Sequence, residues 1–103
     1  MKFVLAYTAR SGGSEVELHE AGKRAQRLLA TWQPSEAATF HEWVQRCDGN
    51  GGFAVLETDN ATDLLKDLTI WSSFLEFSVY PVVDIADATP VTDQAIAVRD
   101  SVS

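Results

Sequence analysis

The sequence predicts an α+β fold in which a single antiparallel sheet of four strands is covered on one face by two helices. Strand-like and helix-like segments follow one another in the order strand, helix, strand, strand, helix, strand. A strong turn signal, Asp48-Gly49-Asn50-Gly51, separates the two middle strands. Two interleaved right-handed crossovers around such a hairpin put both helices on the same side of the sheet. This arrangement is the ferredoxin-like βαββαβ plait.

The first third of the chain predicts one strand and one helix. Residues 2–9, KFVLAYTA, are rich in aromatic and branched side chains and predict a strand. Residues 11–13, SGG, interrupt it, and Ser14 with Glu17 forms a capping-box pattern that starts a helix. Pro34 ends this helix, because proline cannot continue a helix and disfavours helical backbone in the residue before it. The apolar residues recur at spacings of three and four: Leu18, Ala21, Gly22, Ala25, Leu28, Leu29 and Trp32.

The remaining elements follow from similar signals. Strands are predicted at about residues 37–46 and 52–58, and a last strand at 74–82 carries Pro81, which suits an edge strand. Asn60 caps a second helix, and Thr89-Pro90 starts a short C-terminal helix. The second helix has the apolar stripe Ala61, Leu64, Leu65, Leu68 and Trp71, and the C-terminal helix has the stripe Val91, Ala95, Val98 and Val102. The C-terminal stripe could cover the two preceding helices or cross to another subunit.

Length, charge and cysteine content bound the class of protein. The 103 residues predict one domain, with a ferredoxin-like part at 1–83 and a C-terminal helical extension at 84–103. The net charge is -7 and the eight Lys and Arg residues are scattered, which argues against nucleic acid and anionic membrane as partners. No apolar run approaches transmembrane length. The lone Cys47 fits a reducing compartment, so we expect a cytoplasmic protein.

The register of the hairpin decides which side chains share a face of the sheet. One register puts Glu42 opposite Glu57, an unfavourable pair of like charges. The alternative, which a three- or five-residue loop would give, puts His41 opposite Glu57 and Trp43 opposite Val55. We favour the second register, because a glycine at the end of a three-residue loop commonly forms a bulge.

The same reasoning assigns the other strands to the two faces. Small Val4 and Ala6 are predicted to lie under the helices, together with the apolar Leu75, Phe77 and Val79. The face without helices, called the open face, would then be too aromatic to remain in water. We therefore expect a homodimer that forms through the open face. The predicted open-face residues are Phe3, Leu5, Tyr7, His41, Trp43, Phe53, Val55, Glu57, Ser78 and Tyr80.

Several segments resemble one known family. They are the opening MKFVLAYTAR, the Trp32 and Pro34 pair, the GGFAVLETDN strand that runs into the second helix, and the FSVYPVVDI strand. Over about residues 2–88 the chain is similar to a small bacterial family of unknown function within the dimeric α+β barrel superfamily. The resemblance implies a homodimer whose two sheets form a barrel with a pocket in each half. That superfamily includes cofactor-free quinol oxygenases, haem-degrading oxygenases, muconolactone isomerases and stress-inducible proteins, and fold alone does not choose among them.

Two kinds of site are predicted on the open face. His41 with Glu57 could act as a catalytic acid–base pair, in which the carboxylate fixes the imidazole tautomer. Alternatively, the two residues form a structural polar pair at the dimer seam. A small apolar ligand would contact Leu5, Tyr7, Trp43, Val55, Ser78 and Tyr80. His19 lies outside the apolar stripe of its helix and is predicted to be solvated.

No metal and no cofactor are expected. His41 and Glu57 offer two ligands where catalytic zinc needs three and structural zinc four, and Cys47 is predicted to lie too far away. Three functions therefore stay open. The protein could be a cofactor-independent acid–base enzyme of the isomerase, lyase or monooxygenase type. It could be a non-catalytic binding or stress-related module, or a structural dimer whose barrel is packed solid.

Overall fold

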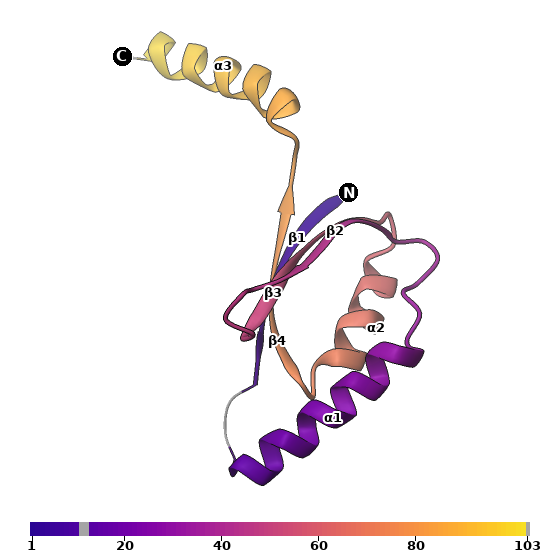
Figure 1. The fold of residues 1–103 in the computed structure, drawn as a ribbon. Helices are drawn as coiled ribbons and strands as arrows, with labels where there is room; N and C mark the ends of the chain where they lie inside the picture. The colour runs from indigo at the N-terminus through magenta and orange to yellow at the C-terminus, as the bar shows by residue number, and fades with distance from the viewer. Residues whose placement is uncertain (11–12, 103) are drawn as a thin grey trace.

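The computed structural model describes residues 1–10 and 13–102 (Figure 1). The order of its elements, βαββαβ followed by a further helix, is the order predicted from the sequence. Residues 11 and 12, which belong to the predicted break after the first strand, lie outside the described residues. The strands are β1 (Lys2–Ala9), β2 (Thr39–Gln45), β3 (Gly51–Glu57) and β4 (Leu75–Val82), and the helices are α1 (Glu15–Thr31), α2 (Ala61–Trp71) and α3 (Ile85–Val102).

The strands form one antiparallel sheet in the order β2-β3-β1-β4. Helices α1 and α2 lie on the same side of this sheet (Figure 1). The fold is therefore the predicted ferredoxin-like plait. The edge position of β4 confirms the interpretation of Pro81, because an edge strand can accommodate a residue that has no N–H to donate.

The sheet face that packs against the helices, called the helix face, is centred on β1 and β3. Leu5, Ala54 and Leu56 are buried there together with Leu64 of α2, and Phe3 packs against the cluster. The prediction that Phe3, Leu5 and Tyr7 lie on the open face is therefore wrong. It assumed that the small side chains of β1 face the helices, whereas the core uses the large ones because they fill more volume.

The outer strand β4 divides its side chains as predicted. Val79 pairs with Leu5 and therefore shares the helix face, as do Phe77 and Leu75, two and four residues before it. Tyr80 pairs with Val4, so it lies on the open face. The other open-face residues of β1, β3 and β4 are Lys2, Ala6, Thr8, Phe53, Val55, Glu57, Glu76 and Ser78.

The predicted register of the β2–β3 hairpin is wrong. Trp43 pairs with Ala54 rather than Val55, so Trp43 lies on the helix face. The Arg46 N–H donates to the Gly51 carbonyl at 2.8 Å, so residues 47–50 form the loop. The predicted register would have needed a loop of three or five residues. Gly49 at φ 75° and Gly51 at φ 132° adopt backbone that other residues rarely do.

A bulge between Phe40 and Glu42 changes the register once more within β2. Phe40 pairs with Leu56 of the helix face, and Thr39 pairs with Glu57 of the open face. The extra residue in β2 lets two neighbouring side chains lie on the same side, so His41 stays on the open face although none of residues 51–57 of β3 pairs with it.

The two helix starts confirm the predicted caps. The Ser14 hydroxyl accepts from the Glu17 N–H at 3.2 Å, and the Asn60 side chain accepts from the N–H groups of Thr62 and Asp63. These bonds satisfy donors that the first turn of a helix leaves free.

The apolar stripe of α2 differs from the predicted one at two positions. Leu65 is 65% exposed, whereas Asp67 is buried together with Leu64 and Trp71. Leu64, Asp67 and Trp71 are spaced by three and four residues, which is the spacing of one helix face. A carboxyl group therefore occupies a core position of α2.

The C-terminal helix α3 projects from the end of β4, away from α1 and α2 (Figure 1). It begins at Ile85, one turn earlier than predicted, because the N–H groups of Asp87 and Ala88 bond to the Asp84 carbonyl. Pro90 consequently lies inside the helix and not at its start. Val91, Val98 and Val102 are exposed. None of the helices in the described ranges is long and apolar enough to cross a membrane.

Replacement of Leu56 by Ala tests the assigned core. Leu56 is 1% exposed, so we expect Leu56→Ala to lower the free energy of unfolding by about 2–5 kcal/mol through lost burial and a new cavity. Leu65→Ala is the matched control, and we expect a change below about 0.5 kcal/mol because Leu65 is exposed. Urea denaturation followed by circular dichroism measures both values. Equal losses in the two variants would contradict the assigned core.

Candidate functional site

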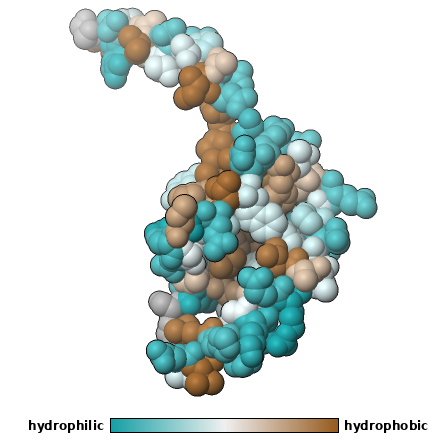
Figure 2. Space-filling model, in the orientation of Figure 1, coloured by the Kyte–Doolittle hydropathy of each residue, from teal (hydrophilic) through white to brown (hydrophobic). Residues whose placement is uncertain are grey.

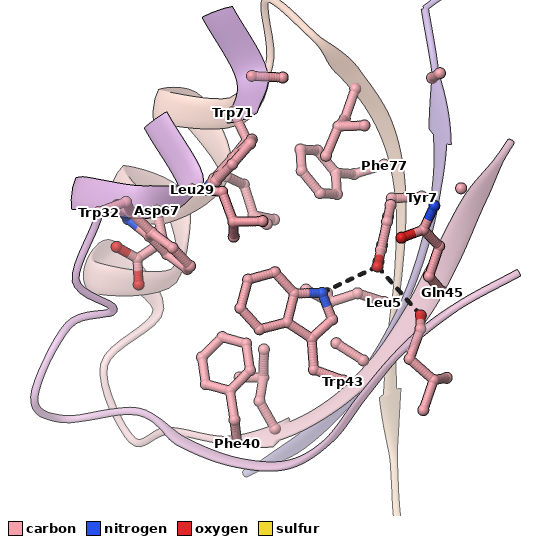
Figure 3. A pocket seen from close by; sticks show the side chains of 18 of the residues that line it. Leu5, Tyr7, Leu29, Trp32, Phe40, Trp43, Gln45, Asp67, Trp71 and Phe77 are labelled. Carbon is pink, nitrogen blue, oxygen red and sulfur yellow. Dashed lines mark hydrogen bonds between the residues drawn. The ribbon is translucent and has the colours of Figure 1, made fainter. Parts of the chain in front are cut away.

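A cavity of about 460 Å³ lies between the helix face of the sheet and helices α1 and α2 (Figure 3). It opens at the surface, since Trp43 is 46% exposed and Leu29 is 44% exposed although both line it. Figure 2 shows the surface hollowed between α1 and the elements above it. Gly22, Ala25 and Leu29 of the apolar stripe of α1 line this space, and none of the residues of α1 is buried.

Aromatic side chains from β1, β2, β4, α2 and the C-terminal cap of α1 surround the cavity (Figure 3). The ring centroids of Trp32 and Trp43 are 5.7 Å apart at an interplanar angle of 88°, and those of Trp32 and Trp71 are 5.6 Å apart at 90°. These are edge-to-face contacts, which aromatic pairs prefer to face-to-face stacking. The aromatic lining residues are Tyr7, Trp32, Phe40, Trp43, Trp71 and Phe77.

Tyr7 links three strands at the sheet end of the cavity. Its ring crosses Gly52, its partner on β3, and a Cβ at Gly52 would collide with the Tyr7 hydroxyl and ring. The hydroxyl accepts from Trp43 Nε1–H at 2.9 Å and donates to the Val44 carbonyl at 3.2 Å (Figure 3). Glycine at position 52 thus allows Tyr7 to fix the indole of Trp43.

Asp67 supplies the carboxyl group of the cavity wall. It is 5% exposed and accepts hydrogen bonds from the backbone N–H and the hydroxyl of Ser35, both at 3.2 Å. Ser35 belongs to the connection between α1 and β2, so these bonds tie that connection to α2. The carboxyl group lies next to Trp32 in Figure 3.

The structure divides the predicted ligand-binding residues between the two faces of the sheet. Leu5, Tyr7 and Trp43 line the cavity. Val55, Ser78 and Tyr80 lie on the open face and do not line it. The six residues therefore do not form one site in this chain.

His41 and Glu57, the predicted catalytic pair, are in contact on the open face. His41 Nε2 lies 2.9 Å from Glu57 Oε1, and the two side chains are 44% and 48% exposed. Lys2 Nζ lies 3.8 Å from Glu57 Oε1 and 2.6 Å from Asp84 Oδ1, and the hydrogen bond to Asp84 raises the pKa of Lys2. The pair thus belongs to a row of exposed charges on the side of the sheet opposite the cavity.

The described residues contain no group of three or more His, Cys, Asp and Glu side chains that could hold a metal ion. Cys47 and His19 are both exposed, as expected for a turn residue and for the flank of α1. The cavity itself is lined mainly by carbon, so its chemistry is that of apolar and aromatic contact with a few polar groups.

Sequence reasoning missed several residues that line the cavity. Trp32 and Trp71 were expected in the core, and Asp67 was not singled out at all. The available signal for Asp67 was its spacing, because it stands three residues after Leu64 and four before Trp71. Phe40 could not be assigned, because the bulge beside it decides its face.

Removal of the Tyr7 hydroxyl tests its linking role. Tyr7→Phe leaves the Trp43 N–H and the Val44 carbonyl without their partner, so we expect a loss of about 0.5–1.5 kcal/mol of unfolding free energy. Tyr80→Phe is the control, since Tyr80 is 55% exposed on the open face, and it should change stability by less than about 0.5 kcal/mol. The tryptophan emission spectrum, to which Trp43 contributes with Trp32 and Trp71, should shift only in the first variant. An unchanged spectrum and stability in Tyr7→Phe would exclude the link.

Comparisons with known proteins give a family but no function. No curated protein matches the sequence. Among solved structures, the chain is similar to the crystal structure of At3g17210 from Arabidopsis thaliana, with 15% sequence identity, coverage of 82% of this chain and 96% of that chain, and a TM-score of 0.30. A family model described as a domain of unknown function, DUF3303, matches residues 1–96. The expected membership of a family of unknown function is thus confirmed, and the chain belongs to the DUF3303 family.

Proposed function

We propose that this protein binds a small, largely apolar molecule in the cavity between the sheet and helices α1 and α2. The observation that carries the proposal is that Gly22, Ala25 and Leu29 of the apolar stripe of α1 line a cavity of about 460 Å³ and not a filled core. This volume lies within the range of about 300–1,000 Å³ that is usual for small-molecule sites.

An apolar ligand would complete the core of the domain. Leu29 and Trp43 line the cavity yet are nearly half exposed. The apolar side chains around an unfilled cavity lack van der Waals partners on one side, and their surface remains in contact with water. A molecule that fills the space regains both, so binding should raise the stability of the folded chain.

The geometry supports binding more strongly than acid–base turnover. His41 and Glu57 lie on the open face, and neither is among the residues that line the cavity. A general base must come within hydrogen-bond reach of the proton that it removes. A molecule in the cavity would have the thickness of the sheet between it and His41.

A neutral fluorescent probe, N-phenyl-1-naphthylamine, tests the binding function. We expect its fluorescence to rise on addition of the protein and its saturating concentration to raise the melting temperature. Ala25→Trp, which points a large ring from α1 into the cavity, should weaken probe binding at least about tenfold, or 1.4 kcal/mol. Ala30→Trp is the matched control on the exposed side of α1 and should bind normally. Equal binding by both variants, or none by the natural chain, would exclude the cavity as the site.

We also propose that two copies associate through their open faces, as in a dimeric α+β barrel. The apolar surface of this face supports the proposal, because Phe53, Val44 and Tyr80 are 48%, 48% and 55% exposed. Exposed apolar patches of this kind usually mark interfaces. In such a dimer the His41–Glu57 pair lies at the seam between the two sheets.

Charge introduced at Phe53 tests this association. We expect the natural chain to have the mass of two copies in light scattering after gel filtration, and Phe53→Asp to have the mass of one, because two buried carboxylates would oppose each other across the interface. Leu65→Asp, at a still more exposed apolar position on α2, should leave the mass unchanged. A natural chain with the mass of one copy would contradict the proposed dimer.

A further inference from the structure

Within the part of the chain that the structure describes, the cavity wall contains a negatively ionisable side chain but no positively ionisable one. Among the described residues that line it, none is Lys, Arg or His, whereas Asp67 contributes a carboxyl group. The chain as a whole carries a net charge of -7. A ligand with a carboxylate or phosphate would therefore find no cation to pair with, and its own charge would lie near that of Asp67.

The carboxyl group of Asp67 has hydrogen bonds but no counter-charge. Its partners are the N–H and the hydroxyl of Ser35, and no ion pair of the described chain includes it. A carboxylate has about four acceptor positions, so these two bonds leave capacity for another donor. A buried charge without an opposite charge is unfavourable, and a bound cation would relieve this cost.

The hydrogen-bond donors of the aromatic side chains in the cavity wall are already used or covered. Trp43 Nε1–H donates to Tyr7, and the Tyr7 hydroxyl donates to the Val44 carbonyl. The indole N–H groups of Trp32 and Trp71 are covered by protein atoms, although neither has a hydrogen-bond partner in the described residues. The remaining side-chain donors among the described residues of the wall are the amide groups of Gln26 and Gln45, which are neutral and also offer acceptors.

The rings meet at large angles, so they present surfaces to the enclosed space from several directions (Figure 3). Trp32 is perpendicular to Trp43 and to Trp71, and Phe40 is inclined at 46° to Trp43. The face of an aromatic ring carries negative charge, and it attracts an organic cation most strongly where water is excluded. Ring faces that no neighbouring ring covers can contact a cation in the cavity.

We propose that the cavity binds an organic cation, a protonated or quaternary amine on an apolar body, with its positive charge between the aromatic rings and the carboxyl group of Asp67. This inference rests on the proposed binding function and adds the charge of the ligand to it. The apolar body would lie along Leu5 and Leu29, and the charged end would lie near Trp32.

Three probes of similar shape and different charge test this proposal. Benzyltrimethylammonium is the cation, neopentylbenzene is its neutral isostere, and phenylacetate is the anion. Each competes with N-phenyl-1-naphthylamine for the full-length protein. We expect the cation to bind at least about tenfold more tightly than the neutral isostere, and the anion not to displace the naphthylamine.

Two variants separate the charge effect from the shape of the cavity. Asp67→Asn keeps an oxygen that accepts from Ser35, so it should fold and bind the neutral isostere normally while its preference for the cation falls about tenfold. Trp43→Leu should weaken binding of the cation more than binding of the neutral isostere. Tyr80→Leu, on the open face, should change neither.

The failures of the two proposals are distinguishable. Naphthylamine binding with equal affinity for the cation and its neutral isostere would overturn the inference about charge and leave the binding function intact. Displacement by phenylacetate would overturn it in the same way, as would an Asp67→Asn variant that keeps the full preference. If neither the naphthylamine nor any of the three probes binds, both proposals fall.

Discussion

Leu5, Ala54 and Leu56 form a continuous apolar row across β1 and β3, and Leu64 of α2 packs against it. The faces of the other side chains of β1, β3 and β4 follow from this contact, since the side chains of a regular strand alternate between its two faces. With Leu5 beneath α2, Tyr7 must share the helix face and Val4 must share the open face. A shift of one residue in any strand would expose this row and bury the charged residues beside it.

This contact holds α2 closely against the sheet, whereas α1 is held mainly at its C-terminal end. Asp67 of α2 holds Ser35 in the connection that follows α1, and Trp32 packs its ring against Trp71. The rest of α1 stands over the sheet with the cavity beneath it (Figure 3). The same carboxyl group thus positions the wall of the cavity and contributes its charge, while Gly52 and Tyr7 position the opposite wall.

The sheet separates two surfaces with different chemistry. The helix face leads to an aromatic cavity with one carboxyl group, and the open face combines apolar side chains with the row of charges around His41 and Glu57. Helix α3 belongs to neither surface within one chain. Most of the stability of a helix in a protein comes from the packing of an apolar face, and the apolar surface where β4 runs into α3 is visible in Figure 2. The exposed Val83 and Ile85 at this junction would be covered only by another molecule.

The sequence by itself determined the order of the elements, the caps at Ser14 and Asn60, the edge position of the strand that contains Pro81, and the side of Leu75, Phe77 and Val79. These features depend on residues that are close in the chain, so local patterns suffice. Only the tertiary structure decided the faces of Leu5, Tyr7 and Trp43 and the burial of Asp67. The loop at residues 47–50 and the bulge at Phe40 set the register of β2, and both depend on pairing across strands. The cavity exists because α1 contacts the sheet mainly through its C-terminal end, at Trp32. This arrangement depends on how the elements pack together and cannot be read from any one segment.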